Sequence, residues 1–212
     1  MLSRSPRVVQ AHLGILLALA AGSLLTGCFV GERPTLRDEP VVDDIAARSV
    51  VDRLALASST DFVATYRVTP TGAGDAAVAT VRVWSAGYRV RVGDVEYRVE
   101  RGSASTCTVA TDECVDELDD ARLSDLNITH RFWGDAFRTR LGLDAARRIG
   151  FTDGSDETVA GVPAACVDIT VPSSVGATGT VRYCALDTGP LARYVGADVV
   201  IELVEFTPMT TG

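Results

Sequence analysis

The chain has no lysine, and all of its basic residues are arginine. It has two histidines, and His130 is the one that lies beyond the first 27 residues. It contains no G-x-S-x-G segment and no C-x-x-C pair. These absences disfavour a histidine-dependent hydrolase and a thiolate zinc site. The N-terminal apolar run covers residues 13–25, fewer than the roughly 20 that a membrane-spanning helix requires.

What the N-terminus does contain is typical of an export signal. Arg4 and Arg7 precede the apolar run, and Leu25-Thr26-Gly27-Cys28 follows it. These four residues match the bacterial lipobox, in which the cysteine thiol receives a diacylglyceryl group before the signal is cut. We expect residues 1–27 to be a lipoprotein signal peptide and Cys28 to carry the lipid, diacylglycerol and palmitate. The alternative is a secreted protein with an incidental cysteine, but position, apolar run and motif coincide here.

Beyond residue 27 the chain is acidic, with 18 arginines against 28 aspartates and glutamates. Such a charge disfavours binding to nucleic acid or to anionic headgroups over a broad surface. Residues 28–42 contain two prolines and no periodicity, which predicts a lipidated cysteine and flexible tether. Residues 43–212 are long enough for a single domain with a sizeable core.

Five cysteines are an odd number for an exported protein, but the lipid would account for Cys28. The other four permit three pairings. We favour Cys107 with Cys114 and Cys166 with Cys184, because each pair flanks a plausible hairpin and export permits disulfides. Metal binding by these cysteines is the rival interpretation, and no metal site or cofactor is predicted.

The periodicity of apolar residues changes several times along the domain. Asp43 or Asp44 can cap a helix that runs to about residue 58. The period then becomes two, which predicts an antiparallel meander with one apolar face and one charged face that carries rows of arginine and glutamate. Its strands are expected at residues 62–69, 78–84, 88–92 and 95–99, with a short hairpin at 105–116.

Residues 118–148 have helical spacing interrupted by glycines and predict two or three short helices. Strands resume at residues 158–159, 165–171, 179–185, 191–195 and 199–206. The fold class is therefore α+β: a curved antiparallel sheet, an open half-barrel, with an N-terminal helix and a helical insertion on its concave side.

The pattern resembles the LolA/LolB-like lipoprotein-carrier fold, including the LppX/LprG-type lipoproteins of mycobacteria. The matching features are the lipobox, the helix before Phe62, the strand pair at residues 62–69 and 78–84, and two later segments. These segments are residues 158–166 (TVAGVPAAC) and 183–189 (YCALDTG). The resemblance implies a half-barrel whose concave face is covered by helices and holds acyl chains. It supplies no catalytic residue.

Four aromatic residues are the candidates for a ligand site: Trp84, Phe132, Trp133 and Phe137. They either line a cavity for a hydrophobic ligand or simply fill the core. His130 has no acid partner suggested by spacing, so no catalytic residue is expected. Asp153, Asp156 and Glu157 are interpreted as a solvated turn, with calcium binding as the weaker alternative.

Two functions follow from location and fold. The first is a membrane-anchored, extracytoplasmic binding or carrier protein for a lipid or other hydrophobic ligand, without enzymatic activity. The second is a sensor or scaffold of the cell envelope that acts through contact with a partner protein. A ligand-sized cavity would favour the first function.

Overall fold

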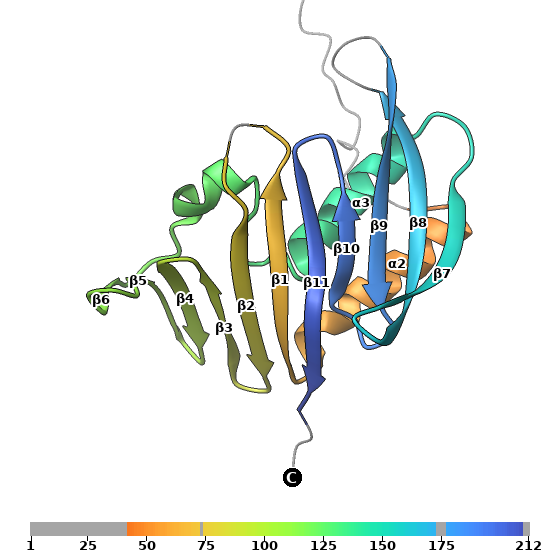
Figure 1. The fold of residues 1–212 in the computed structure, drawn as a ribbon. Helices are drawn as coiled ribbons and strands as arrows, with labels where there is room; N and C mark the ends of the chain where they lie inside the picture. The colour runs from red at the N-terminus through yellow and green to blue at the C-terminus, as the bar shows by residue number, and fades with distance from the viewer. Residues whose placement is uncertain (1–41, 73, 173–176, 210–212) are drawn as a thin grey trace, which may run out of the picture. The chain divides into compact units, whose positions relative to one another are not determined.

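The computed structural model describes residues 42–72, 74–172 and 177–209 of the chain. The predicted signal peptide, Cys28 and nearly all of the tether lie outside the described residues. Within these ranges the chain forms an α+β domain built on one antiparallel sheet of 11 strands, which is curved and open (Figure 1). None of the helices in the described ranges is long and apolar enough to cross a membrane.

The sheet consists of two meanders joined through the first and last strands. Its strand order is β6-β5-β4-β3-β2-β1-β11-β10-β9-β8-β7. The first meander comprises β1 (Phe62–Pro70), β2 (Ala77–Trp84), β3 (Gly87–Val92), β4 (Val95–Glu100), β5 (Ser103–Thr108) and β6 (Glu113–Val115). The second comprises β7 (Asp153–Val159), β8 (Val162–Pro172), β9 (Thr178–Leu186), β10 (Leu191–Val195) and β11 (Val199–Pro208).

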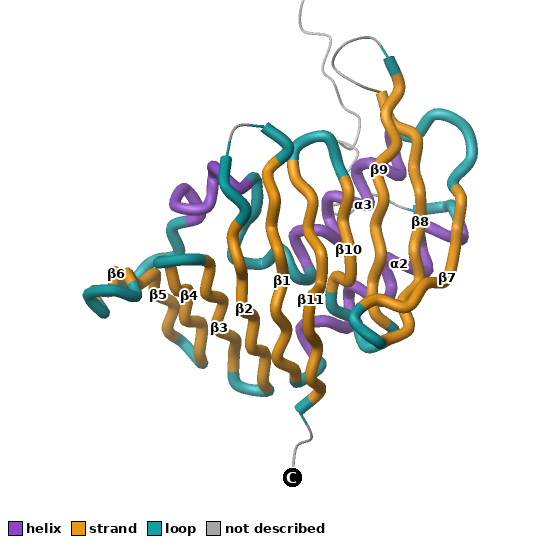
Figure 2. Tube along the Cα trace, viewed as in Figure 1, coloured by secondary structure: helices purple, strands orange, loops and turns teal. Residues whose placement is uncertain are grey.

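Helices cover one face of this sheet, as Figure 2 shows. They are α2 (Ile45–Leu56), the short 3-10 helices η1 (Ala57–Ser59) and η2 (Asp120–Leu126), and α3 (Asp135–Arg147). Asp44 caps α2 by accepting a hydrogen bond from the Ala47 backbone N–H at 3.0 Å. Ala47, Val50 and Leu54 form the buried stripe of α2. These apolar residues are spaced three and four positions apart, which is the spacing that predicts an amphipathic helix here.

The inner face of the sheet is apolar and the outer face is charged, as the alternation of residues predicts. In β1 the side chains of Phe62, Ala64, Tyr66 and Val68 are buried under the helices. The α+β half-barrel with helices on one face is therefore confirmed. One prediction is wrong: Asp153, Asp156 and Glu157 do not form a turn but lie in the edge strand β7. Their side chains are polar because β7 borders solvent.

Four of the chain's five tyrosines are buried in the core and Tyr88 packs against it, and burial raises the pKa of each of them. For Tyr97 burial raises the pKa to about 12, with a further contribution from Asp120 and Asp119. An unfolded tyrosine ionises near pH ~10. Because the folded pKa lies above the unfolded one, this contribution to stability is complete below about pH 10 and is lost as the pH rises through the folded pKa.

The free energy of unfolding should therefore fall steadily above about pH 10. Urea unfolding at stepwise alkaline pH measures this decline, and near-ultraviolet tyrosinate absorbance follows ionisation in the folded state. Tyrosines that titrate near pH ~10 in the folded protein would contradict the predicted burial.

Candidate functional site

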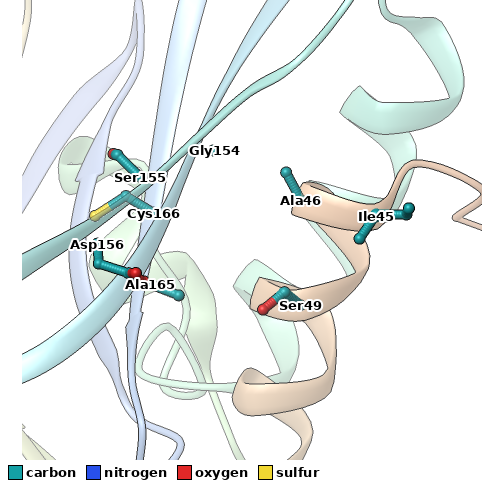
Figure 3. A pocket seen from close by; sticks show the side chains of 8 residues that line it. All are labelled: Ile45, Ala46, Ser49, Gly154, Ser155, Asp156, Ala165 and Cys166. Carbon is teal, nitrogen blue, oxygen red and sulfur yellow. The ribbon is translucent and has the colours of Figure 1, made fainter.

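A groove lies between α2 and the strands β7 and β8 at one end of the sheet, and has a volume of about 380 Å³ (Figure 3). Ile45, Ala46 and Ser49 line it from the helix. This volume falls within the roughly 300–1,000 Å³ of ordinary ligand pockets. The strands contribute Gly154, Ser155, Asp156, Ala165 and Cys166 to the lining.

Small residues let α2 approach the strands beside the groove. Gly154 pairs with Val167, whose side chain is fully buried, so Gly154 lies on the helix-facing side of β7. A Cβ at Gly154 would lie 2.8 Å from the Ala46 Cβ, which is closer than two such atoms approach. Glycine therefore allows the first turn of α2 to rest on β7. Small residues of this kind carry no sequence signal of a binding site, so the sequence analysis missed the groove.

Exposed apolar side chains lie beside the first turn of α2, where Ile45 also lines the groove. Ile45 is 83% exposed and Phe151 is 99% exposed, and Ile149 is also exposed. The loop that carries the last two is held beside α2, because Thr152 hydrogen-bonds the Asp44 carboxylate. We call Ile45, Ile149 and Phe151 the apolar rim. The rim lies where the described chain begins, at Val42.

Three of the four candidate aromatic residues fill the core. Phe132 packs edge-on against Tyr66 at 5.1 Å between ring centroids. Trp133 contacts Phe62, and its backbone carbonyl accepts a hydrogen bond from Leu191 on β10. Phe137 packs against Tyr194 at 4.7 Å and is likewise buried. The helical insertion thus attaches to the sheet through these rings.

Trp84 lies on the opposite face of the sheet from Phe132, Trp133 and Phe137. Val83 points inward with 2% exposure, so the alternation of β2 turns Trp84 outward. There it lines a pocket of about 260 Å³ with Arg82 and Arg89. Of the two alternatives, filling the core describes Phe132, Trp133 and Phe137, whereas Trp84 lies on the outer face.

His130 is a buried part of the core rather than an exposed side chain. Its ring stacks against Tyr97 and Tyr88, at centroid distances of 5.4 and 6.1 Å. Its Nδ1 lies 2.9 Å from the Asp120 carboxylate, which also accepts the His130 backbone N–H. The sequence did not reveal this acid partner, because Asp120 belongs to a separate element, the 3-10 helix η2. The pair holds the insertion against β3 and β4.

Both predicted disulfides are present. Cys107 pairs with Cys114 across β5 and β6, and Cys166 pairs with Cys184 across β8 and β9. The sulfurs of the second bridge approach Glu157 within 4.8 Å, a grouping that thiols would turn into a set of metal ligands. A disulfide sulfur lacks the thiolate charge of such a ligand, so the bridge favours the structural interpretation.

No family model and no curated protein matches this chain. Solved structures do. The crystal structure of MucB shares 17% sequence identity over 78% of this chain, with a TM-score of 0.48. The structure of the MucA/MucB complex from Pseudomonas aeruginosa shares 17% sequence identity with this chain, with a TM-score of 0.47. The chain spans 60% of the length of MucB.

A second kind of structure is also similar to the chain. It is a putative outer membrane lipoprotein-sorting protein domain from Vibrio parahaemolyticus, at 8% identity and a TM-score of 0.30. The match covers 77% of this chain and 94% of that domain. These likenesses concern the arrangement of the strands and helices.

Proposed function

We propose that this chain is a lipoprotein anchored through Cys28 to the outer side of a membrane, and that its domain binds a hydrophobic ligand in the groove between α2 and the strands β7 and β8. The observation that carries the proposal is the groove of about 380 Å³, with the exposed apolar side chain of Ile45 in its lining. An exposed phenyl ring and two exposed isoleucines are costly in water unless they contact another apolar surface.

The position of the rim supports a lipid ligand. Between Cys28 and Val42 the tether reaches at most about 45 Å when fully extended. Ile45 is the first residue of α2 and lies close to Cys28 along the sequence, so the tether would keep it within about that distance of the anchor.

A binding role without catalysis is part of the same proposal. The His130 ring is stacked in the core and held by Asp120, which suits a structural role. The lining of the groove is mostly aliphatic or small, which suits a ligand held by apolar contact. Asp156 is the ionisable side chain among the lining residues.

The edge strand β7 supports the second candidate function, contact with a partner protein. Within the described ranges β7 pairs with β8 alone, so its other side offers free backbone groups to an added strand. Asp153, Asp156 and Glu157 on this strand discourage unspecific pairing between copies. A sensor or scaffold of the cell envelope could therefore use the same edge of the sheet.

Ser49→Leu tests the groove. The leucine side chain should fill the space between α2 and β7 and weaken binding of the fluorescent probe N-phenylnaphthylamine by about tenfold or more, because apolar contact area is lost. The measurement is a fluorescence titration of the full chain, with native mass spectrometry of the same samples for co-purifying lipid. Ala55→Leu is the matched control, since it adds leucine at an exposed position of the same helix.

Equal probe binding by Ser49→Leu, Ala55→Leu and the unchanged chain would contradict a ligand site in the groove. The absence of co-purifying lipid together with that result would favour the sensor or scaffold.

Cys28→Ser tests the anchor. The variant should lose metabolic labelling by radioactive palmitate and should move from the membrane fraction to the soluble fraction, because no thiol remains to carry the acyl groups. Fractionation of cells that express each form measures both effects. If the Cys28→Ser chain stays in the membrane fraction because its signal peptide is not cleaved, its larger mass will show this. If the cleaved chain stays in the membrane fraction, anchoring through Cys28 is refuted.

A further inference from the structure

The outer face of the first meander concentrates positive charge in an otherwise acidic chain. Arg82 on β2 lies directly opposite Arg89 on β3, and Arg89 lies directly opposite Arg98 on β4. Arg67 and Arg91 belong to the same outer face. We call Arg82, Arg89 and Arg98 the arginine row. It crosses three adjacent strands with cations in register.

Cations directly opposite each other destabilise a sheet. Acidic residues offset part of this repulsion: Glu96 and Asp112 pair with Arg98, and Glu100 pairs with Arg89 at 3.1 Å. Among the ion pairs of the described residues, none includes Arg82. Arg82 on β2 therefore keeps a charge that no acidic residue of the described ranges offsets through an ion pair.

A pocket adjoins this end of the row. Arg82, Trp84 and Arg89 line its volume of about 260 Å³. Gly87 lies directly opposite Trp84 and contributes no side chain to cover the indole ring. A Cβ at Gly87 would lie 1.9 Å from the Val99 carbonyl oxygen, so the close approach of β4 requires glycine there. The indole consequently stays half-buried beside two guanidinium groups.

We propose that this pocket binds a phosphate-bearing ligand, with Arg82 and Arg89 on the phosphate and the attached organic group against Trp84. Guanidinium groups match phosphate oxygens through paired hydrogen bonds, so a phosphate can balance Arg82 while it shares Arg89 with Glu100. The volume exceeds that of a phosphate alone. The indole offers a flat apolar surface to the rest of the molecule.

This site is separate from the proposed groove. The groove faces the helices, at the other end of the sheet, and shares no lining residue with the pocket at Trp84. If the pocket at Trp84 fails to bind its ligand, the proposed groove is not thereby contradicted, and the reverse also holds.

The test is a titration of tryptophan fluorescence with phenyl phosphate, in the full chain with Cys28→Ser so that no acyl group is present. Trp84 is the accessible indole and Trp133 is buried, so the response should be saturable and should vanish in Trp84→Phe. Arg82→Gln and Arg89→Gln should each weaken binding by about tenfold or more, because a charged hydrogen bond is lost. Arg101→Gln, an exposed arginine in a turn outside the pocket, is the charge-matched control and should bind as before.

Two further arms identify the source of the phosphate. Vesicles of phosphatidylcholine with phosphatidic acid, compared with phosphatidylcholine alone, probe a lipid headgroup. Binding that depends on phosphatidic acid and on Arg82 assigns the site to a headgroup, whereas response to phenyl phosphate alone assigns it to a soluble phosphate ester. Either result supports the proposal.

Three results would overturn it. The first is the absence of a saturable response to phenyl phosphate, and the second is equally tight binding of benzoate. The third is tighter binding of polyglutamate with the same dependence on Arg82 and Arg89, which would assign the row to an acidic protein partner.

Thermal unfolding separates a binding role from a structural one. Arg82→Gln should raise the Tm by up to about 4 °C, because it removes one member of a like-charge pair. A lower Tm in this variant would show that Arg82 supports the fold, and would also overturn the proposal.

Discussion

Phe132→Ala is expected to lower the free energy of unfolding by about 3–5 kcal/mol. The Phe132 ring is fully buried and packs edge-on against Tyr66, so alanine leaves a cavity between the helical insertion and β1. Urea unfolding followed by far-ultraviolet circular dichroism measures the change. The same variant should bind N-phenylnaphthylamine in the groove as before, provided that it is assayed well below its unfolding midpoint.

Leu143→Ala is the matched control, because Leu143 lies on α3 in the same insertion and is half-exposed. We expect it to change the free energy of unfolding by less than about 0.5 kcal/mol, as for ordinary surface positions. A small effect at Phe132 combined with weaker probe binding would reverse our conclusion. It would mean that this ring covers a ligand rather than filling the core.

The second large effect is expected from the bridge between β8 and β9. Cys166→Ala combined with Cys184→Ala should lower the free energy of unfolding by about 3 kcal/mol on the chain-entropy model, because the 18-residue separation is no longer closed in the unfolded chain. Both residues are buried, so lost packing adds to this effect. Equilibrium unfolding in urea, with and without a thiol reductant for the unchanged chain, separates the two contributions.

Cys107→Ala with Cys114→Ala provides the comparison. Its loop is shorter, with a separation of 7, and β6 is an exposed edge strand. The loss should be slightly smaller, about 2.5 kcal/mol by the same model. If reduction leaves the urea midpoint of the unchanged chain unaffected, neither bridge stabilises the fold in the way proposed.

The elements of this fold could be predicted from local patterns. Alternation at Phe62, Ala64 and Tyr66 is a property of neighbouring residues, and it locates β1 within a residue of its observed bounds. The hairpin argument for the cysteine pairs is equally local and gives both observed bridges. These features depend on short stretches of chain, so the sequence contains the information they need.

The faces and edges of the sheet were harder to predict. The outward orientation of Trp84 follows from the inward orientation of Val83, so alternation alone could have separated it from Phe132. Asp153 and Asp156 are typical turn residues, so the sequence predicts a turn where the structure has β7. The strand forms because it pairs with β8, although its own residues have low strand propensity. The arginine row depends on the register between strands, which the geometry of the hairpin turns sets together with the hydrophobic pattern.

The groove could not be predicted by the same means. Ser49, Gly154 and Ala165 come from three separate elements and have no chemistry in common beyond small size. Only the path of α2 across the sheet brings them together, and that path is set by the buried stripe on the other side of the helix.

The pairing of β1 with β11 has a consequence for when the domain can fold during synthesis. The two strands form the middle of the sheet, yet one is the first strand of the domain and the other the last. Each meander has its own hairpins and can begin to form early, but the halves cannot join until residues 199–208 are available. An exported chain would therefore complete this domain only after β11 (Val199–Pro208) has been synthesised and has crossed the membrane. Until then, one side of β1 is an open sheet edge that is prone to aggregation.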